Sequence, residues 1–172
     1  MLHVNGLNSP KIKTESELVE IMAGYRVANK TVGLCVGCFD LLHPGHMVHF
    51  ISGKKRCDKL VVGVTCDAYV KVRKGDKRPI YDENVRAFSI SCLESVDAVL
   101  VSPYKTAVEL IKNLKPNYYI KGPDYKDSTE PAQIDEREAI KSVGGEVIYT
   151  QDDTLSTTQI IKHIATLDSQ IE

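Results

Sequence analysis

The stretch TVGLCVGCFDLLHPGH, residues 31–46, decides the fold. Its first half, Thr31 to Gly37, is a short apolar run that ends in glycine, which predicts a strand buried on both faces. Its second half places two histidines around a Pro-Gly pair, where a helix is expected to begin. The stretch therefore predicts a strand followed by a polar turn and a helix.

The same alternation of strands and helices continues along the chain. Further strands are predicted at residues 60–65, 98–101, 118–120 and 146–150, and helices at residues 15–29, 46–57, 82–94, 106–114, 131–143 and 157–166. Apolar strands that alternate with helices favour a parallel sheet covered on both faces. We therefore predict an α/β protein, a Rossmann-like three-layer α/β/α fold with a five-stranded parallel sheet. Ligands bind such sheets beyond the carboxyl ends of the strands.

Length and composition set the remaining limits. The 172 residues predict one domain, residues 14–172, after an irregular and loosely held tail, residues 1–13. A balance of 22 basic against 23 acidic residues excludes a broadly cationic nucleic-acid-binding protein. No apolar run reaches the roughly 18 residues that span a membrane. Five cysteines without a signal peptide predict reduced thiols and a cytoplasmic location.

Two histidines mark the turn after the first strand. His43 and His46 flank the start of a helix, where free N–H groups and the helix dipole attract anions. Gly45 between them allows a ligand to approach the backbone. Phosphoryl transfer needs positioned donors of this kind rather than a protein nucleophile. A metal site formed by His43, His46 and His49 is the weaker alternative, because the H-E-x-x-H pattern is absent.

The decapeptide from Gly37 to His46 resembles the signature of the cytidylyltransferase-like nucleotidyltransferases with a His-x-Gly-His motif. The resemblance is closest to the adenylyltransferase domains of bacterial ADP-heptose synthases and covers about residues 15–164. Three further segments carry it: Lys74-Gly-Asp-Lys-Arg-Pro79, Ile120-Lys-Gly-Pro-Asp-Tyr125 and Leu155-Ser-Thr-Thr-Gln-Ile-Ile161.

The resemblance implies transfer of a nucleoside monophosphate from a nucleoside triphosphate to a phosphorylated sugar or alcohol, with release of pyrophosphate and with Mg²⁺ as cofactor. It implies His43, His46 and Lys74 as catalytic residues. It also implies nucleotide contacts from the first turn, at Gly37, Cys38, Phe39, Asp40 and Gly45.

A basic run follows the second strand, at the end of the sheet where the ligand is expected. Residues 71–78 contain five lysines and arginines around one glycine. The run is either a solvated loop or a cationic cover over the triphosphate. The resemblance implies a phosphate-contacting lysine here, with Lys71 and Lys74 as candidates. It also implies triphosphate binding by Arg86, which otherwise reads as an exposed helix arginine.

Two more turns at strand ends carry polar residues. After the fourth strand, Gly122, Asp124 and Tyr125 suit a nucleoside pocket, although Pro123 stands where the family usually has glycine. After the fifth strand, the last helix begins with residues that suit a helix cap and a second anion site, namely Ser156, Thr157 and Thr158.

The function predicted most directly is transfer of AMP from ATP to a sugar phosphate such as a heptose 1-phosphate. A cytidylyltransferase acting on glycerol-3-phosphate or another polyol phosphate is the alternative. That enzyme carries an arginine before its Ser-Thr-Thr, whereas this chain has residues 151–155, QDDTL. A non-catalytic nucleotide-binding regulatory module and a redox or zinc protein built on Cys35 and Cys38 complete the alternatives. A homodimer is the default expectation for an oligomer.

Overall fold

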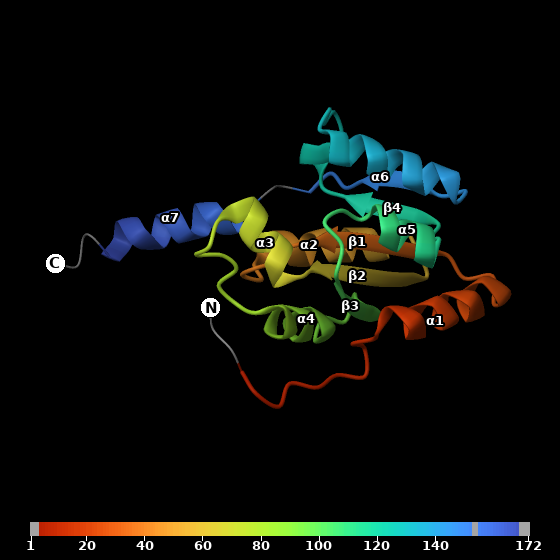
Figure 1. Cartoon of the computed structure of the whole chain (residues 1–172), viewed down its shortest axis with the longest axis horizontal. Coiled ribbons are helices and arrows are strands. Elements are labelled where there is room, and N and C mark those ends of the chain that lie inside the picture. The colour runs from red at the N-terminus through yellow and green to blue at the C-terminus, as the bar shows by residue number, and fades with distance from the viewer. Residues whose placement is uncertain (1–3, 153–154, 169–172) are drawn as a thin grey trace.

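A computed structural model describes residues 4–152 and 155–168. Five strands form one sheet in which every neighbouring pair is parallel, in the order β3-β2-β1-β4-β5 (Figure 1). The strands are β1 (Val32–Gly37), β2 (Lys59–Thr65), β3 (Ala98–Ser102), β4 (Tyr118–Lys121) and β5 (Glu146–Tyr149). The helices are α1 (Glu15–Val27), α2 (Pro44–Lys54), α3 (Asp67–Lys74), α4 (Glu83–Ser91), α5 (Val108–Leu114), η1 (Pro123–Tyr125), α6 (Pro131–Ser142) and α7 (Thr157–Asp168).

Helices cover both faces of the sheet, because successive residues of each buried strand point to opposite sides. In β1, Leu34 packs with α1, α5 and α6, whereas Cys35 packs with α2 and α4. The two resulting apolar cores are separated by the sheet. The predicted Rossmann-like three-layer α/β/α fold with a five-stranded parallel sheet is therefore confirmed.

Local sequence signals explain where the helices begin. Thr14 and Glu17 form a reciprocal capping box at the start of α1. Asp82 accepts hydrogen bonds from two backbone N–H groups at the start of α4. Both helices therefore begin where the sequence predicts.

Two segments differ from the sequence prediction. Residues 67–74 form helix α3 instead of a loop, so three of the five basic residues of the run lie on a helix. The N-terminal segment is irregular, but its end is held against the sheet. Ile12 forms a parallel bridge with Val99, and the ammonium of Lys11 donates to the carbonyl of Leu93 at 2.8 Å.

The strand order places the chain reversal between β1 and β4. The loops that follow the two strands at such a reversal leave the sheet toward opposite faces, and a crevice opens between them. The turn containing the two histidines follows β1, so the fold places it at this crevice. No helix within residues 4–152 and 155–168 is both long and apolar enough to cross a membrane.

Candidate functional site

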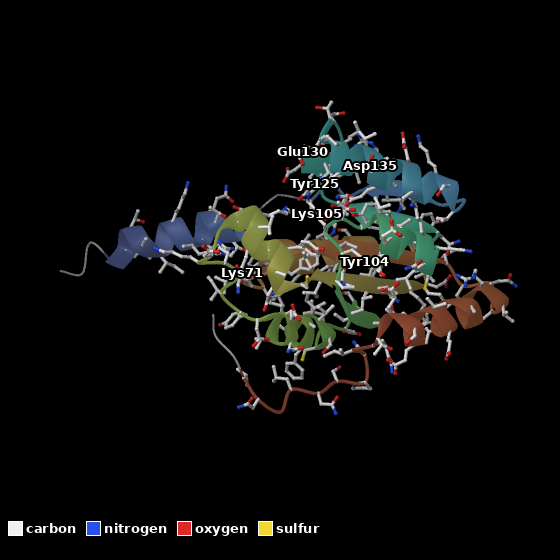
Figure 2. All side chains as sticks on the ribbon, in the orientation of Figure 1. Lys71, Tyr104, Lys105, Tyr125, Glu130 and Asp135 are labelled. Carbon is white, nitrogen blue, oxygen red and sulfur yellow. The ribbon has the colours of Figure 1, made fainter. Side chains whose placement is uncertain are left out.

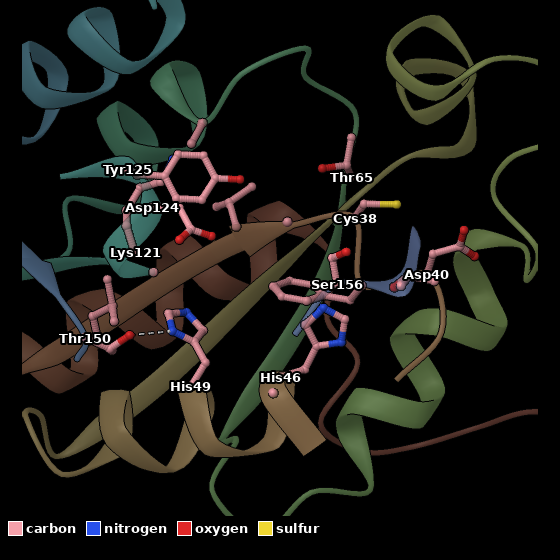
Figure 3. A pocket seen from close by; sticks show the side chains of 18 of the residues that line it. Cys38, Asp40, His46, His49, Thr65, Lys121, Asp124, Tyr125, Thr150 and Ser156 are labelled. Carbon is pink, nitrogen blue, oxygen red and sulfur yellow. Dashed lines mark hydrogen bonds between the residues drawn. The ribbon is translucent and has the colours of Figure 1, made fainter. Parts of the chain in front are cut away.

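A cavity of about 300 Å³ lies at the carboxyl ends of the strands. Its walls come from the ends of β1, β2 and β4, the start of α2, the end of α3, the loop after β3 and the segment that leads from β5 into α7. Figure 3 shows His46 and Ser156 between Cys38 and Asp40 on one side and His49 and Thr150 on the other. The cavity therefore lies at the crevice that the topology predicts.

His43 and His46 form a stacked pair at the start of α2. Their ring centroids lie 3.7 Å apart with an interplanar angle of 22°. Pro44 fills the first helical position, and the His43 side chain makes no capping bond. Neither ring nitrogen of His43, nor Nδ1 of His46, has a hydrogen-bond partner among the residues described. Buried ring nitrogens are normally paired, so these are available to a ligand.

Both imidazoles of the pair are neutral at physiological pH. Burial lowers the pKa of His43. Burial, followed by the nearby His43, His49 and Lys74, lowers the pKa of His46 to about 3. A neutral imidazole carries one N–H donor and one acceptor nitrogen, so each ring offers a single directed hydrogen bond to a phosphate oxygen.

This low pKa predicts an acid-sensitive fold. Unfolded histidine takes up a proton below about pH 6.5, whereas folded His46 stays neutral down to about pH 3, so stability falls as the pH drops through this window. Replacement by asparagine removes that contribution. Urea unfolding at pH 7 and pH 4.5 measures how much the free energy of unfolding decreases between the two pH values. This decrease is expected to be about 1–2 kcal/mol smaller in His46→Asn than in the unchanged protein. An identical loss would contradict it, and His163→Asn, at an exposed position of α7, is the control.

Gly45 lies where the turn, the helix and the chain after β5 meet. A Cβ atom there would lie 3.1 Å from Cβ of Leu155 and 3.2 Å from the His43 ring. Either neighbour would have to move to accept a side chain. Glycine at this position therefore keeps His43 and the segment before α7 close together across the cavity.

The turn after β1 is fixed by contacts that do not involve a ligand. Phe39 adopts a positive φ of 46°, and its ring lies over Gly37 and edge-on to His46. The buried carboxylate of Asp40 accepts from Arg78 and from the backbone N–H of Ile80. Asp40 therefore lines the cavity but is already paired, and it ties the segment after α3 to the turn.

The basic run contributes one of the two predicted lysines and one arginine to the cavity wall. Lys74 and Arg73, at the end of α3, line the cavity, and the positive charge of Lys74 contributes to lowering the pKa of His46. Lys71 lies on α3 but does not line the cavity (Figure 2). The structure thus selects Lys74 over Lys71 as the lysine beside the histidines, and it adds Arg73.

Arg86 occupies a structural position rather than the predicted triphosphate-facing one. Its side chain is completely buried and does not line the cavity. The guanidinium donates to the carbonyls of Tyr81, Cys38 and Thr65 and to the carboxylate of Asp67 at 2.7 Å. Because its Nε, Nη1 and Nη2 are all used, Arg86 joins the ends of β1 and β2 to the start of α3.

The last helix begins as the sequence predicts. Ser156 accepts from the backbone N–H of Gln159, whose side chain accepts in return from the N–H of Ser156. Ser156 and Thr157 line the cavity, and the buried Thr157 hydroxyl donates to the carbonyl of Leu41. Thr158 is exposed and lies outside the cavity lining.

The turn after β4 also lines the cavity. Gly122, Asp124 and Tyr125 all contribute to it, and the ring of Tyr125 lies 4.2 Å from the ammonium of Lys121. Pro123 begins the short helix η1, a position that suits proline because its φ is fixed near the helical value and no backbone N–H is needed there.

The same wall contains a buried polar cluster that was not predicted from the sequence. One oxygen of Glu136 accepts from the backbone N–H of Ala107, and the other accepts from Tyr119 and from Lys121 at 2.9 Å. Lys121 also donates to Gln133 at 2.6 Å. Burial lowers the pKa of Lys121, and the charge of Glu136 opposes that effect. One signal was available, because Glu136 precedes buried Ala139 and Ile140 by three and four residues and so shares their helix face.

The alternative site classes gain no support from the geometry. Burial raises the pKa of both Cys35 and Cys38, which disfavours the thiolate that redox and zinc chemistry require. His49 bonds to the hydroxyl of Thr150 at 3.2 Å. Within residues 4–152 and 155–168, no group of three or more His, Cys, Asp or Glu side chains is arranged to hold a metal ion.

Comparison with known proteins agrees with this geometry. The model of the cytidylyltransferase-like family matches residues 34–163, which include the histidine turn and the start of α7. The chain belongs to the cytidylyltransferase-like family. This membership confirms the family resemblance and the enzyme class, a nucleotidyltransferase, that were predicted from the sequence.

Individual relatives refine the comparison. The chain is 39% identical over 158 residues to the bifunctional protein HldE of Paramagnetospirillum magneticum, and 38% identical over 137 residues to that of Bradyrhizobium sp.. These matches cover 91% and 80% of this chain, but the chain spans only 31% and 27% of the two relatives.

Two solved structures share the fold. A lipopolysaccharide core biosynthesis protein of Thermoplasma volcanium matches with a TM-score of 0.59 and 28% identity, over 73% of this chain and 99% of that one. The pantoate–β-alanine ligase of Francisella tularensis matches with a TM-score of 0.60 over 86% of this chain and 69% of that one. At 13% identity, this second match concerns the fold alone.

Proposed function

We propose that this protein transfers AMP from ATP to the phosphate of a sugar phosphate, such as a heptose 1-phosphate, and releases pyrophosphate. The observation that carries the proposal is the stacked, neutral histidine pair at the start of α2, with three buried ring nitrogens unpaired among the described residues and with Lys74 beside it. The similarity to bifunctional HldE proteins supports the choice of acceptor, because the sequence resemblance to ADP-heptose synthases implies a heptose 1-phosphate.

In the proposed reaction, an oxygen of the acceptor phosphate attacks the α-phosphorus of ATP. The new P–O bond forms as the bond from the α-phosphorus to the bridging oxygen breaks, and the electron pair leaves with pyrophosphate. N–H groups of His43 and His46 donate to the phosphate oxygens, which gather charge in the transition state. Lys74 and Arg73 offset the charge of the departing pyrophosphate.

Mg²⁺ supplies charge neutralisation to the triphosphate in this chemistry. It is usually held by phosphate oxygens, water and one or two carboxylates. Four carboxylates of the described residues line the cavity, and those of Asp40 and Glu136 are bonded to cationic side chains. The lining carboxylates that no cation engages in the described part of the chain are Asp124 and Asp152, and these would be the residues to hold Mg²⁺.

The acceptor is placed at the wall formed by the loop after β3 and the start of α6. Tyr104 and Lys105, both labelled in Figure 2, line the cavity from that loop. Gln133 and Glu136 line the same cavity. Amide, ammonium and carboxylate groups of this kind suit a phosphorylated, hydroxyl-rich substrate.

Pyrophosphate release tests the proposal. The purified chain with Mg²⁺ is combined with each of the four nucleoside triphosphates and with heptose 1-phosphate, glycerol-3-phosphate and other sugar phosphates. We expect the highest kcat/KM for ATP with a sugar 1-phosphate. Highest activity with CTP and glycerol-3-phosphate would favour the cytidylyltransferase alternative. Nucleotide binding without pyrophosphate from any pair would favour the regulatory module.

A further inference from the structure

The segment that leaves β5 is fastened to α2 beside the cavity. The hydroxyl of Ser52 donates to Oδ1 of Asp152 at 2.7 Å, and one turn earlier on the same helix His49 bonds to Thr150 at 3.2 Å. Because Ser52 and His49 are three residues apart, they lie on the same face of α2. Asp152 is thus held in a defined position in the cavity wall.

The second oxygen of this carboxylate is unpaired within the part of the chain that the structure describes. Oδ2 of Asp152 is buried and accepts no hydrogen bond from the described part of the chain. A buried carboxylate oxygen without a donor is costly, and such groups are normally paired. The residue lines the cavity, so a donor carried by a bound ligand would complete its hydrogen bonding.

The position of Asp152 indicates which part of a nucleotide that donor belongs to. A negative carboxylate repels phosphates, and the cationic pair Arg73 and Lys74 lies on another wall, at the end of α3. Figure 3 shows His49 and Thr150, the neighbours of Asp152, on the opposite side of His46 from Cys38 and Asp40. A nucleotide with its triphosphate beside Lys74 therefore directs its base toward Asp152.

The chemistry of the bases makes this contact selective. At C6 of a purine and C4 of a pyrimidine, adenine and cytosine carry an amino group, which donates, whereas guanine and uracil carry a carbonyl oxygen, which only accepts. A carboxylate accepts from the amino group and repels the carbonyl. We propose that Asp152 is a specificity-determining residue that reads the amino group at C6 of adenine or C4 of cytosine and selects ATP and CTP over GTP and UTP. This inference rests on the proposed function.

The test is a change of base preference in Asp152→Asn. Asparagine retains an oxygen that can accept from Ser52, and its amide NH₂ can donate to a base carbonyl. We expect the kcat/KM ratio of ATP to GTP, and of CTP to UTP, to fall about 10- to 100-fold in the variant, the range of one charged hydrogen bond. Calorimetric titration with each nucleotide is expected to show the same change in Kd. Asp127→Asn, at an exposed position outside the cavity, is the matched control.

The outcomes separate this inference from the proposed function. Equal base preference in Asp152→Asn and the unchanged protein, with pyrophosphate still released, would overturn the inference alone. A variant effect confined to the KM of the acceptor would overturn it as well, because Asp152 would then contact the sugar. Base-selective binding that depends on Asp152, without pyrophosphate release, would support the inference and overturn the proposed function.

Discussion

His46→Ala is expected to lower kcat for pyrophosphate release by about 10²–10³-fold, the usual loss when one donor to a transition-state oxygen is removed. The ring lies in the cavity wall, with Lys74 near enough to affect its pKa and with Nδ1 unpaired among the described residues. Its hydrogen bond is needed most when charge gathers on the phosphate oxygens. The KM for ATP should therefore change by less than about threefold. Steady-state kinetics with saturating acceptor measures both values.

The stacking of His46 on His43 leads to a second prediction, which concerns the double variant. Because the two rings lie 3.7 Å apart and face the same cavity, they are expected to act on the same phosphate oxygens as a unit. The double alanine variant should then lose less than the product of the two single losses. His163→Ala, on the exposed part of α7, is the control and should remain within about twofold of the unchanged protein. Retention of more than about a tenth of kcat in His46→Ala would contradict the assigned role.

The layers of this protein could be predicted from the sequence because buried strands and helices place apolar residues in recognisable patterns. Each strand is an apolar run, and each of Thr14 and Asp82 stands just before a helix that it caps. Helix α3 was missed because its sequence shows little of such a pattern. Val70 is its one fully buried residue in the structure, and its last turn is basic, so the segment reads as a charged loop.

The backbone of the histidine turn could be predicted because a local motif specifies it. Whether a polar side chain contacts the ligand or another part of the protein could not be predicted in the same way. The turn of His43 and His46 follows from a strand, a Pro-Gly pair and a helix start, all of which are local. The orientation of Arg86 depends on carbonyls of Cys38 and Thr65, distant in sequence, which no local pattern specifies. The pairing of Lys121 with Glu136 depends in the same way on the packing of α6 against β4.

Arg86→Ala is expected to lower the free energy of unfolding by about 3–5 kcal/mol in the absence of nucleotide, the usual cost of breaking a buried ion pair. The substitution leaves the carboxylate of Asp67 without its cation and the carbonyls of Cys38, Thr65 and Tyr81 without this donor. For a chain of this length the midpoint of thermal unfolding should fall by roughly 10 °C. Urea unfolding gives the free energy directly.

Arg86→Lys separates this structural role from triphosphate binding. Lysine keeps the positive charge but cannot reproduce the planar set of donors that contacts four groups at once, so it should also destabilise the protein, by about 2 kcal/mol. Had Arg86 bound the triphosphate, the lysine variant would instead unfold like the unchanged protein and raise the KM for ATP about tenfold or more. The control is Arg56→Ala, at an exposed position after α2, which should change stability by less than about 0.5 kcal/mol. A stable Arg86→Lys variant with a raised KM would return Arg86 to the nucleotide, and would require its guanidinium to leave the carbonyls that it joins here.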